Sequence, residues 1–178
     1  PQYLVETSDE KAFGFALQTD WAPVKNFNFF VNAQYIDVTF KDRVTRSGVD
    51  LKGQPTGEPL WSFALGGSYL HELGQAGEVE FLVAHAYEGK QRCNDESLGQ
   101  GSCLDNGVFS VGEAQNRTDL RLYWRDADDR VQIGAFVNNL FNNRYVNGVN
   151  NISADTLGTP FASISEPRIW GLDIQLKY

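Results

Sequence analysis

The last twelve residues of the chain alternate between apolar and polar side chains almost without interruption. The apolar positions are Trp170, Leu172, Ile174, Leu176 and Tyr178. Side chains on a β-strand point alternately to opposite faces, so this segment presents one apolar and one mainly polar surface. A tilted strand needs about 9–11 residues to cross a bilayer. The end of the chain therefore predicts a membrane-spanning β-strand.

Six earlier segments repeat the same two-residue period. They are Lys11–Ala22, Phe27–Phe40, Leu60–His71, Glu78–Tyr87, Gln115–Arg125 and Val131–Asn138. The connections alternate between short turns and long polar loops, which cover residues 41–59, 88–114 and 147–166. Bacterial outer-membrane barrels join antiparallel strands in this way, with the short turns in the periplasm and the long loops outside the cell. The sequence therefore predicts an all-β fold, an antiparallel transmembrane β-barrel.

A soluble antiparallel barrel of the lipocalin type would show a similar alternation. The polar faces of several segments, however, consist mostly of Gly, Ala, Ser, Asn and Gln, whereas water-facing strands usually carry more Lys, Glu and Thr. Aromatic residues also gather near both ends of the segments, as the two interfaces of a bilayer favour. These observations favour a membrane barrel with a polar interior.

The odd number of strands leaves two interpretations open. A self-contained bacterial barrel has an even number of strands and both ends in the periplasm. Residues Gln2–Thr7 would supply an eighth strand, although they alternate poorly. The alternative is that the chain is the C-terminal part of a larger barrel, since an open sheet in lipid would leave unpaired backbone groups at its edges. The second interpretation is favoured.

Cys93 and Cys103 lie ten positions apart in a loop rich in Gly, Ser, Asn and Asp. In an exported protein such a pair predicts a disulfide within the loop. Closing a loop this short restricts the unfolded chain and stabilises the fold by about 2–3 kcal/mol in the entropic description.

Two motifs resemble those of TonB-dependent outer-membrane receptors. The first is a stretch of the type N-L-F-(D/N)-x-x-Y, and the second is a closing strand of the type P-R-x-(Y/W/F)-G with an aromatic residue at the end. The matching positions are Asn139, Leu140, Phe141, Asn142, Asn143 and Tyr145, followed by Pro167, Arg168, Trp170, Gly171 and Tyr178. The family usually ends in Phe, and this chain ends in Tyr. The resemblance covers the last forty residues.

The resemblance implies a barrel of about 22 strands with a plug domain inside it. Such receptors sit in the outer membrane of Gram-negative bacteria and import ferric siderophores, cobalamin or oligosaccharides with energy from the TonB complex. This sequence contains neither the plug nor the segment that binds TonB, so residues 1–178 are expected to form the last third of such a barrel. Its partners would be outer-membrane lipid, the rest of the receptor, TonB and a nutrient. The competing hypothesis is a complete eight-stranded outer-membrane protein with a structural or adhesion role.

Ligand binding is expected at the extracellular mouth, where loops stand on a rigid scaffold. The candidates are Arg43, Arg46, Lys90, Arg92, Asn147, Asn150 and Asn151. An anionic siderophore would favour the arginines, and a sugar would favour the asparagines together with Phe109 or Phe161. The resemblance further implies that polar interior residues such as Gln18, Asn32, Gln34 and Arg121 contact the plug.

Composition and spacing argue against several other functions. The net charge of −8 and the lack of a basic cluster exclude nucleic acid as a partner. The two histidines, His71 and His85, have no further ligands at metal-binding spacing. No nucleophile is paired with a base, so neither an enzyme nor a cofactor is expected.

Overall fold

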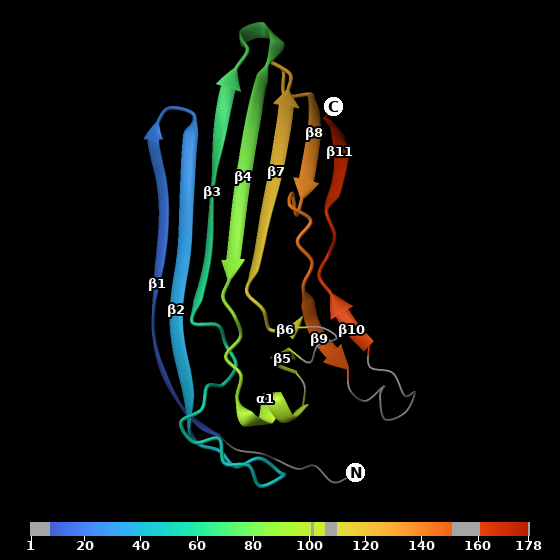
Figure 1. Ribbon diagram of the computed structural model, residues 1–178. Helices are drawn as coiled ribbons and strands as arrows, with labels where there is room; N and C mark the ends of the chain where they lie inside the picture. The colour runs from blue at the N-terminus through green and yellow to red at the C-terminus, as the bar shows by residue number, and fades with distance from the viewer. Residues whose placement is uncertain (1–7, 101, 106–109, 151–160, 178) are drawn as a thin grey trace.

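A computed structural model describes residues 8–100, 102–105, 110–150 and 161–177. Its main feature is a seven-stranded antiparallel sheet in the order β1-β2-β3-β4-β7-β8-β11, shown in Figure 1. The strands are β1 (Asp9–Val24), β2 (Phe27–Asp42), β3 (Trp61–Glu72), β4 (Glu78–Glu88), β7 (Gln115–Arg125), β8 (Val131–Asn138) and β11 (Ile169–Leu176). All seven predicted strands are confirmed. Among these described residues the sheet is not closed, because β1 and β11 each pair with one neighbouring strand. The proposed strand at Gln2–Thr7 lies outside the described residues.

The strand register keeps the apolar side chains on one face across the whole sheet. Tyr35 of β2 lies opposite Phe15 of β1 and Trp61 of β3, and its ring centroid is 5.5 Å and 5.0 Å from theirs. At the far edge Leu172 of β11 lies opposite Ala135 of β8. Because a shift of one residue would turn a strand over, this register is what makes the apolar face continuous.

The opposite face is polar, and glycine makes room on it for large rings. A Cβ atom at Gly66 would lie 2.6 Å from the ring of Phe30, its partner on β2, and one at Gly171 would lie 2.8 Å from the ring of Phe136. In each pair the ring covers the glycine of the next strand. Glycine in a strand is therefore explained here by close packing.

The short connections lie at one end of the sheet, beside the chain's C-terminus in Figure 1. Asn26 and Asp129 take left-handed backbone angles, with φ of 65° and 52°, which tight turns need and which Asn and Asp tolerate. The carboxylate of Asp126 accepts hydrogen bonds from the backbone N–H groups of Arg130 and Val131, both at 2.7 Å. The bond from Val131, followed by that from Arg130, lowers the pKa of Asp126. A 3-10 helix, η1 (Gly74–Ala76), forms part of the β3–β4 turn.

The described parts of the long connections fold into a second unit at the other end of the sheet, which we call the loop-end domain (residues 43–60, 89–100, 102–105, 110–114, 139–150 and 161–168). It contains α1 (Asp95–Gln100), β5 (Leu104–Asp105), β6 (Ser110–Val111), β9 (Val146–Asn150) and β10 (Phe161–Ile164). These strands form a small sheet in the order β10-β9-β6-β5, in which β6 and β9 are parallel. These segments were predicted to be loops, because strands of two to five residues show too little alternation to be recognised in a sequence.

The buried apolar side chains gather at this end of the molecule. Leu51 and Cys103 are fully buried, and Phe40, Val38 and Val111 are nearly so. The loop-end domain and the adjoining tip of β2 therefore hold the apolar core, whereas both faces of the long sheet remain open. No helix among the described residues is long and apolar enough to cross a membrane.

Candidate functional site

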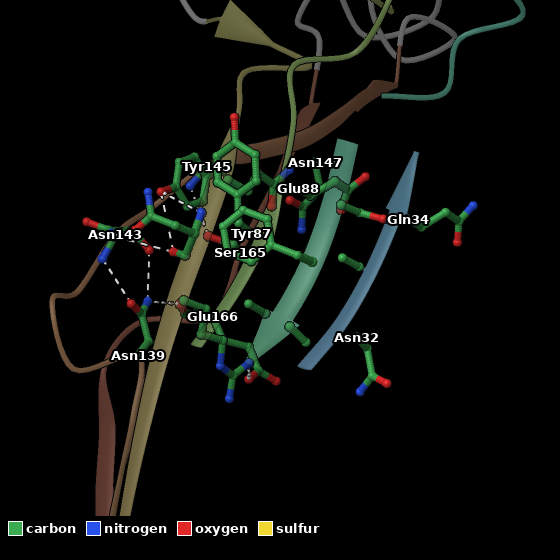
Figure 2. A pocket seen from close by; sticks show the side chains of 18 of the residues that line it. Asn32, Gln34, Tyr87, Glu88, Asn139, Asn143, Tyr145, Asn147, Ser165 and Glu166 are labelled. Carbon is green, nitrogen blue, oxygen red and sulfur yellow. Dashed lines mark hydrogen bonds and ion pairs between the residues drawn. The ribbon is translucent and has the colours of Figure 1, made fainter. Parts of the chain in front are cut away.

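A cavity of about 670 Å³ lies on the polar face of the sheet next to the loop-end domain (Figure 2). Neighbouring strands place alanines side by side at its base, where Ala64 of β3 pairs with Ala86 of β4. Their small side chains leave the space open. Polar groups surround this base: Gln18, Asn32, Gln34, Ser62, Glu88 and Gln115 from the strands, and Asn139, Asn143, Tyr145, Asn147, Ser165 and Glu166 from the segments beyond β8.

One wall of the cavity is built by the first family-like motif, and Asn139 holds it together. This side chain is only 4% exposed, and its backbone is left-handed with φ of 54°. Its amide donates to the carbonyls of Asn143, at 2.8 Å, and Glu166, at 3.0 Å, and its oxygen accepts from the N–H of Asn143 at 3.0 Å. Asn139 thus joins the turn after β8 to the segment before β11.

The same motif is also fixed to β7. The hydroxyl of Tyr145 accepts a hydrogen bond from the N–H of Asn116 at 3.1 Å, and the amide of Asn143 donates to the Asn116 side chain at 2.6 Å. The N–H of Leu140 donates to the carbonyl of Thr118 at 2.8 Å. The motif therefore shapes the cavity wall through bonds within the chain.

The second motif joins the same turn to the edge of the sheet. The N–H of Arg168 donates to the side chain of Asn142 at 2.9 Å. Pro167 is exposed just before the strand, and Trp170 is 76% exposed on the apolar face, as is expected of a lipid-facing residue. Gly171 accommodates the ring of Phe136, as described above. Phe141 is exposed, and Tyr178 lies outside the described residues.

Several side-chain amides that line the cavity form no hydrogen bond with the described part of the chain. Among the described residues the side chains of Gln18, Asn32, Gln34, Gln115 and Asn147 make no hydrogen bond, and Glu88 has no cationic partner. Arg117 is the cation in the lining, and its Nε donates to Asp119 at 2.8 Å while its Nη1 lies 3.6 Å from Glu166. Figure 2 shows Glu88 and Asn147 close together at the loop side of the cavity.

The cationic residues predicted to bind a ligand lie outside this lining and mostly pair with carboxylates. Arg43 lies 2.8 Å from Glu96 of α1 and over the ring of Phe40, with 4.9 Å to the centroid. Arg92 pairs with Asp37 at 2.5 Å, and Lys90 with Glu113 at 3.1 Å. Arg46 is exposed in a turn. Their role in ligand binding stays a prediction.

The three predicted asparagines have different positions. Asn147 on β9 lines the cavity, and its role in ligand binding stays a prediction. Asn150 ends the same strand, and Asn151 lies outside the described residues. The sequence analysis missed Glu88 and Gln115 as cavity residues. Their positions at strand ends on the polar face are visible in the sequence. The cavity wall opposite them, however, is built by residues far away in the sequence.

Two further hollows adjoin the polar face. One of about 390 Å³ shares Glu88, Gln115 and Asn147 with the first cavity and continues between the loops to Glu58 and Glu113. The other, of about 560 Å³, lies nearer the short turns. Its polar lining residues are Asp20, Asn28, Ser68, Asp119 and Arg121. The lining of the candidate site is thus continuous from the sheet into the loop-end domain.

The predicted disulfide is present between Cys93 and Cys103, whose Cα atoms are 5.6 Å apart. It encloses α1, and Asn94 caps this helix by accepting a hydrogen bond from the N–H of Ser97 at 2.8 Å. The Asn94 amide also donates to the carbonyl of Pro55 at 2.9 Å, which ties the second long loop to the first. The disulfide therefore supports the loops that adjoin the cavity.

The histidines occupy structural positions. Nδ1 of His85 lies 2.8 Å from the hydroxyl of Thr118, and the ring of His71 lies 6.3 Å from that of Tyr69. Among the described residues no group of three or more His, Cys, Asp or Glu side chains is placed to hold a metal ion.

Comparison with known proteins gives a relative in structure. The crystal structure of the ferric yersiniabactin uptake receptor FyuA from Yersinia pestis matches with a TM-score of 0.69 at 17% sequence identity. The chain has the fold of one segment of that receptor. The match covers 95% of this chain but 24% of the receptor chain, so this chain spans about a quarter of its length. The predicted all-β antiparallel fold is thereby confirmed, as the fold of a segment of that receptor's barrel. No family model and no curated protein matches the sequence.

Proposed function

We propose that this chain forms the C-terminal barrel strands and extracellular loops of a TonB-dependent outer-membrane receptor that imports a scarce nutrient. The observation that carries the proposal is the sheet itself. Seven consecutive strands keep one apolar face, yet β1 and β11 have no partner at their outer edges among the described residues. Its likeness to a segment of an uptake receptor supports the same assignment.

The open edges indicate what must complete the structure. A backbone N–H or C=O group without a partner in hydrocarbon costs several kcal/mol, so an open sheet is not stable in a membrane. Further strands of the same polypeptide would pair with β1 and β11 and close the barrel. The plug of the receptor would then lie against the polar face, near the ion pairs of Arg125 with Glu78, at 2.7 Å, and Glu80, at 2.5 Å.

The two ends of the sheet fit the two sides of an outer membrane. Short periplasmic turns and longer extracellular loops are the rule in these barrels, so the loop-end domain would lie at the cell surface. The disulfide suits this oxidising location. A nutrient would enter through the loop-end domain and meet the cavity on the polar face before it reached the plug.

Cross-linking to TonB tests the proposal. The natural polypeptide that contains this chain should fractionate with the outer membrane and form a formaldehyde cross-link to TonB in living cells. A strain that lacks TonB provides the control for the cross-linked band. Recovery of the polypeptide from the outer membrane without any TonB cross-link would contradict the transport function.

A further inference from the structure

The first cavity and the smaller hollow form one candidate binding surface at the mouth of the proposed receptor. Both are lined by Glu88, Gln115 and Asn147, so a ligand that passes between the loops meets the same side chains as one that rests on the sheet. We call these two spaces together the mouth site. The basic residues of the loops suggested an anionic ligand, but the side chains that line the mouth site have a different chemistry.

The mouth site is acidic. Four carboxylates line it, Glu58, Glu88, Glu113 and Glu166, against the lining cation Arg117. Arg117 is already paired with Asp119 and lies near Glu166. Like charges repel each other, and more strongly near a protein surface than in bulk water. An anionic ligand is therefore disfavoured beside Glu88.

Hydrogen-bonding capacity dominates the rest of the lining. Each of the five unused amides, on Gln18, Asn32, Gln34, Gln115 and Asn147, offers two N–H donors and one carbonyl acceptor. A sugar hydroxyl likewise both donates and accepts, so amides and hydroxyls satisfy each other. Tyr145, whose hydroxyl is held by Asn116, adds a fixed aromatic ring at the wall.

The carboxylates themselves are mostly engaged. Glu58 accepts a hydrogen bond from Thr56, and Glu113 pairs with Lys90. Glu88 is left as one free carboxylate beside five free amides, a ratio that suits an uncharged ligand with many hydroxyl groups better than a cation. A free carboxylate is also a strong acceptor for a hydroxyl donor.

We propose that the mouth site binds an uncharged, hydroxyl-rich ligand of the oligosaccharide class and discriminates against anions. This inference rests on the proposed transport function and names the chemical class of its substrate. Gln115, Asn147 and Glu88 form the shared contact surface. Gln18, Asn32 and Gln34, which the family resemblance assigns to contacts with the plug, border this surface on the sheet.

Equilibrium binding to the full-length receptor, purified from outer membranes in detergent, tests the proposal. The neutral probes are hexasaccharides of glucose, mannose, xylose, galactose and N-acetylglucosamine. The anionic probes are hexagalacturonate and ferric citrate, and the cationic probe is a glucosamine hexamer. Native mass spectrometry reports which probe is retained. At least one neutral probe should bind at least tenfold more tightly than any charged one.

Substitutions in the lining test whether the probe binds at the mouth site. Asn147→Ala and Glu88→Ala should each weaken the neutral probe about tenfold, and Glu88→Gln should weaken it less because the amide keeps a hydrogen bond. Asp128→Ala, in a short turn at the far end of the sheet, is the control and should bind as the unmodified receptor does. Unchanged binding by the Asn147 and Glu88 variants would overturn the assignment of the site.

The outcomes separate the two proposals. Retention of an anionic or cationic probe in preference to every neutral one, or of no neutral probe, overturns the inference even if the receptor is cross-linked to TonB. Absence of the TonB cross-link overturns the transport function, whichever probe is retained.

Discussion

The long sheet and the loop-end domain are stabilised in different ways. In the loop-end domain Leu51 and Cys103 are fully buried, a disulfide encloses α1, and Arg43 and Arg92 pair with carboxylates. The sheet is joined by its backbone ladder, by ring contacts such as Tyr35 with Trp61 and by ion pairs such as Arg125 with Glu78, but its apolar residues remain exposed. One region carries its own core, whereas the other, in the proposed receptor, would depend on lipid outside and on further protein inside. On that proposal, the exposed apolar side chains of the sheet mark where the lipid would lie.

The largest expected effect is the loss of stability when a substitution creates a cavity in the loop-end domain. Leu51→Ala removes a fully buried side chain and should lower the local unfolding free energy by about 2–5 kcal/mol. Hydrogen exchange of the full-length receptor should show faster exchange in residues 43–60 and 89–100, with the strands of the sheet unchanged. Leu98→Ala, at a position that is 43% exposed, is the matched control. Equal loosening of the sheet would show that the two regions are not independent.

The next effect concerns the apolar face. Leu172 is 74% exposed on it, and Leu172→Arg should destabilise the folded receptor in lipid vesicles by about 2–4 kcal/mol, since a charge there would meet hydrocarbon. Gln175→Arg, on the opposite face of the same strand, should cost far less. Urea titration of both variants gives the difference. A similar loss of stability in both variants would mean that the apolar face does not contact lipid.

A smaller effect is expected at the junction of the two regions. Asn139→Ala leaves the carbonyls of Asn143 and Glu166 without their donor, which should cost about 1–3 kcal/mol. Asn142→Ala is the control, because Asn142 has a similar positive φ of 56° but is exposed and its side chain accepts a hydrogen bond from the N–H of Arg168 at 2.9 Å. The readout is urea unfolding of the full-length receptor. If the two variants lose the same stability, the backbone angle and not the buried amide is what matters at Asn139.

The smallest effect belongs to the short turns. Hydrogen bonds from Val131 and Arg130 lower the pKa of Asp126 below its ordinary value of 3.8. A carboxyl group whose pKa is lower in the folded state stabilises the fold above the pKa of the unfolded state, and this stabilisation is lost as the pH falls through the folded value. Asp126→Asn should therefore flatten the pH dependence of stability below about pH 4. An equal flattening of the curve in Asp128→Asn, two residues away in the same turn, would contradict the assignment to Asp126.

The sequence predicted the sheet far better than the site. Alternation is local, so each strand from β1 to β11 in the long sheet could be recognised from its own residues. The small sheet depends on pairs distant in sequence, such as Val111 with Val146, which no local pattern shows. Arg92 illustrates the same difficulty, because its partner Asp37 lies 55 positions earlier. The positive charges of the loops were visible in the sequence, but their neutralising partners were not.

The mass of the natural polypeptide in the outer membrane tests the central claim most directly. An antibody against residues 88–114 would identify it in membrane fractions, and intact-mass measurement would give its length. The account predicts a species several times larger than the 19.9 kDa of this chain, because the sheet needs further strands to close. A species of about 20 kDa would contradict it and would support a self-contained small barrel.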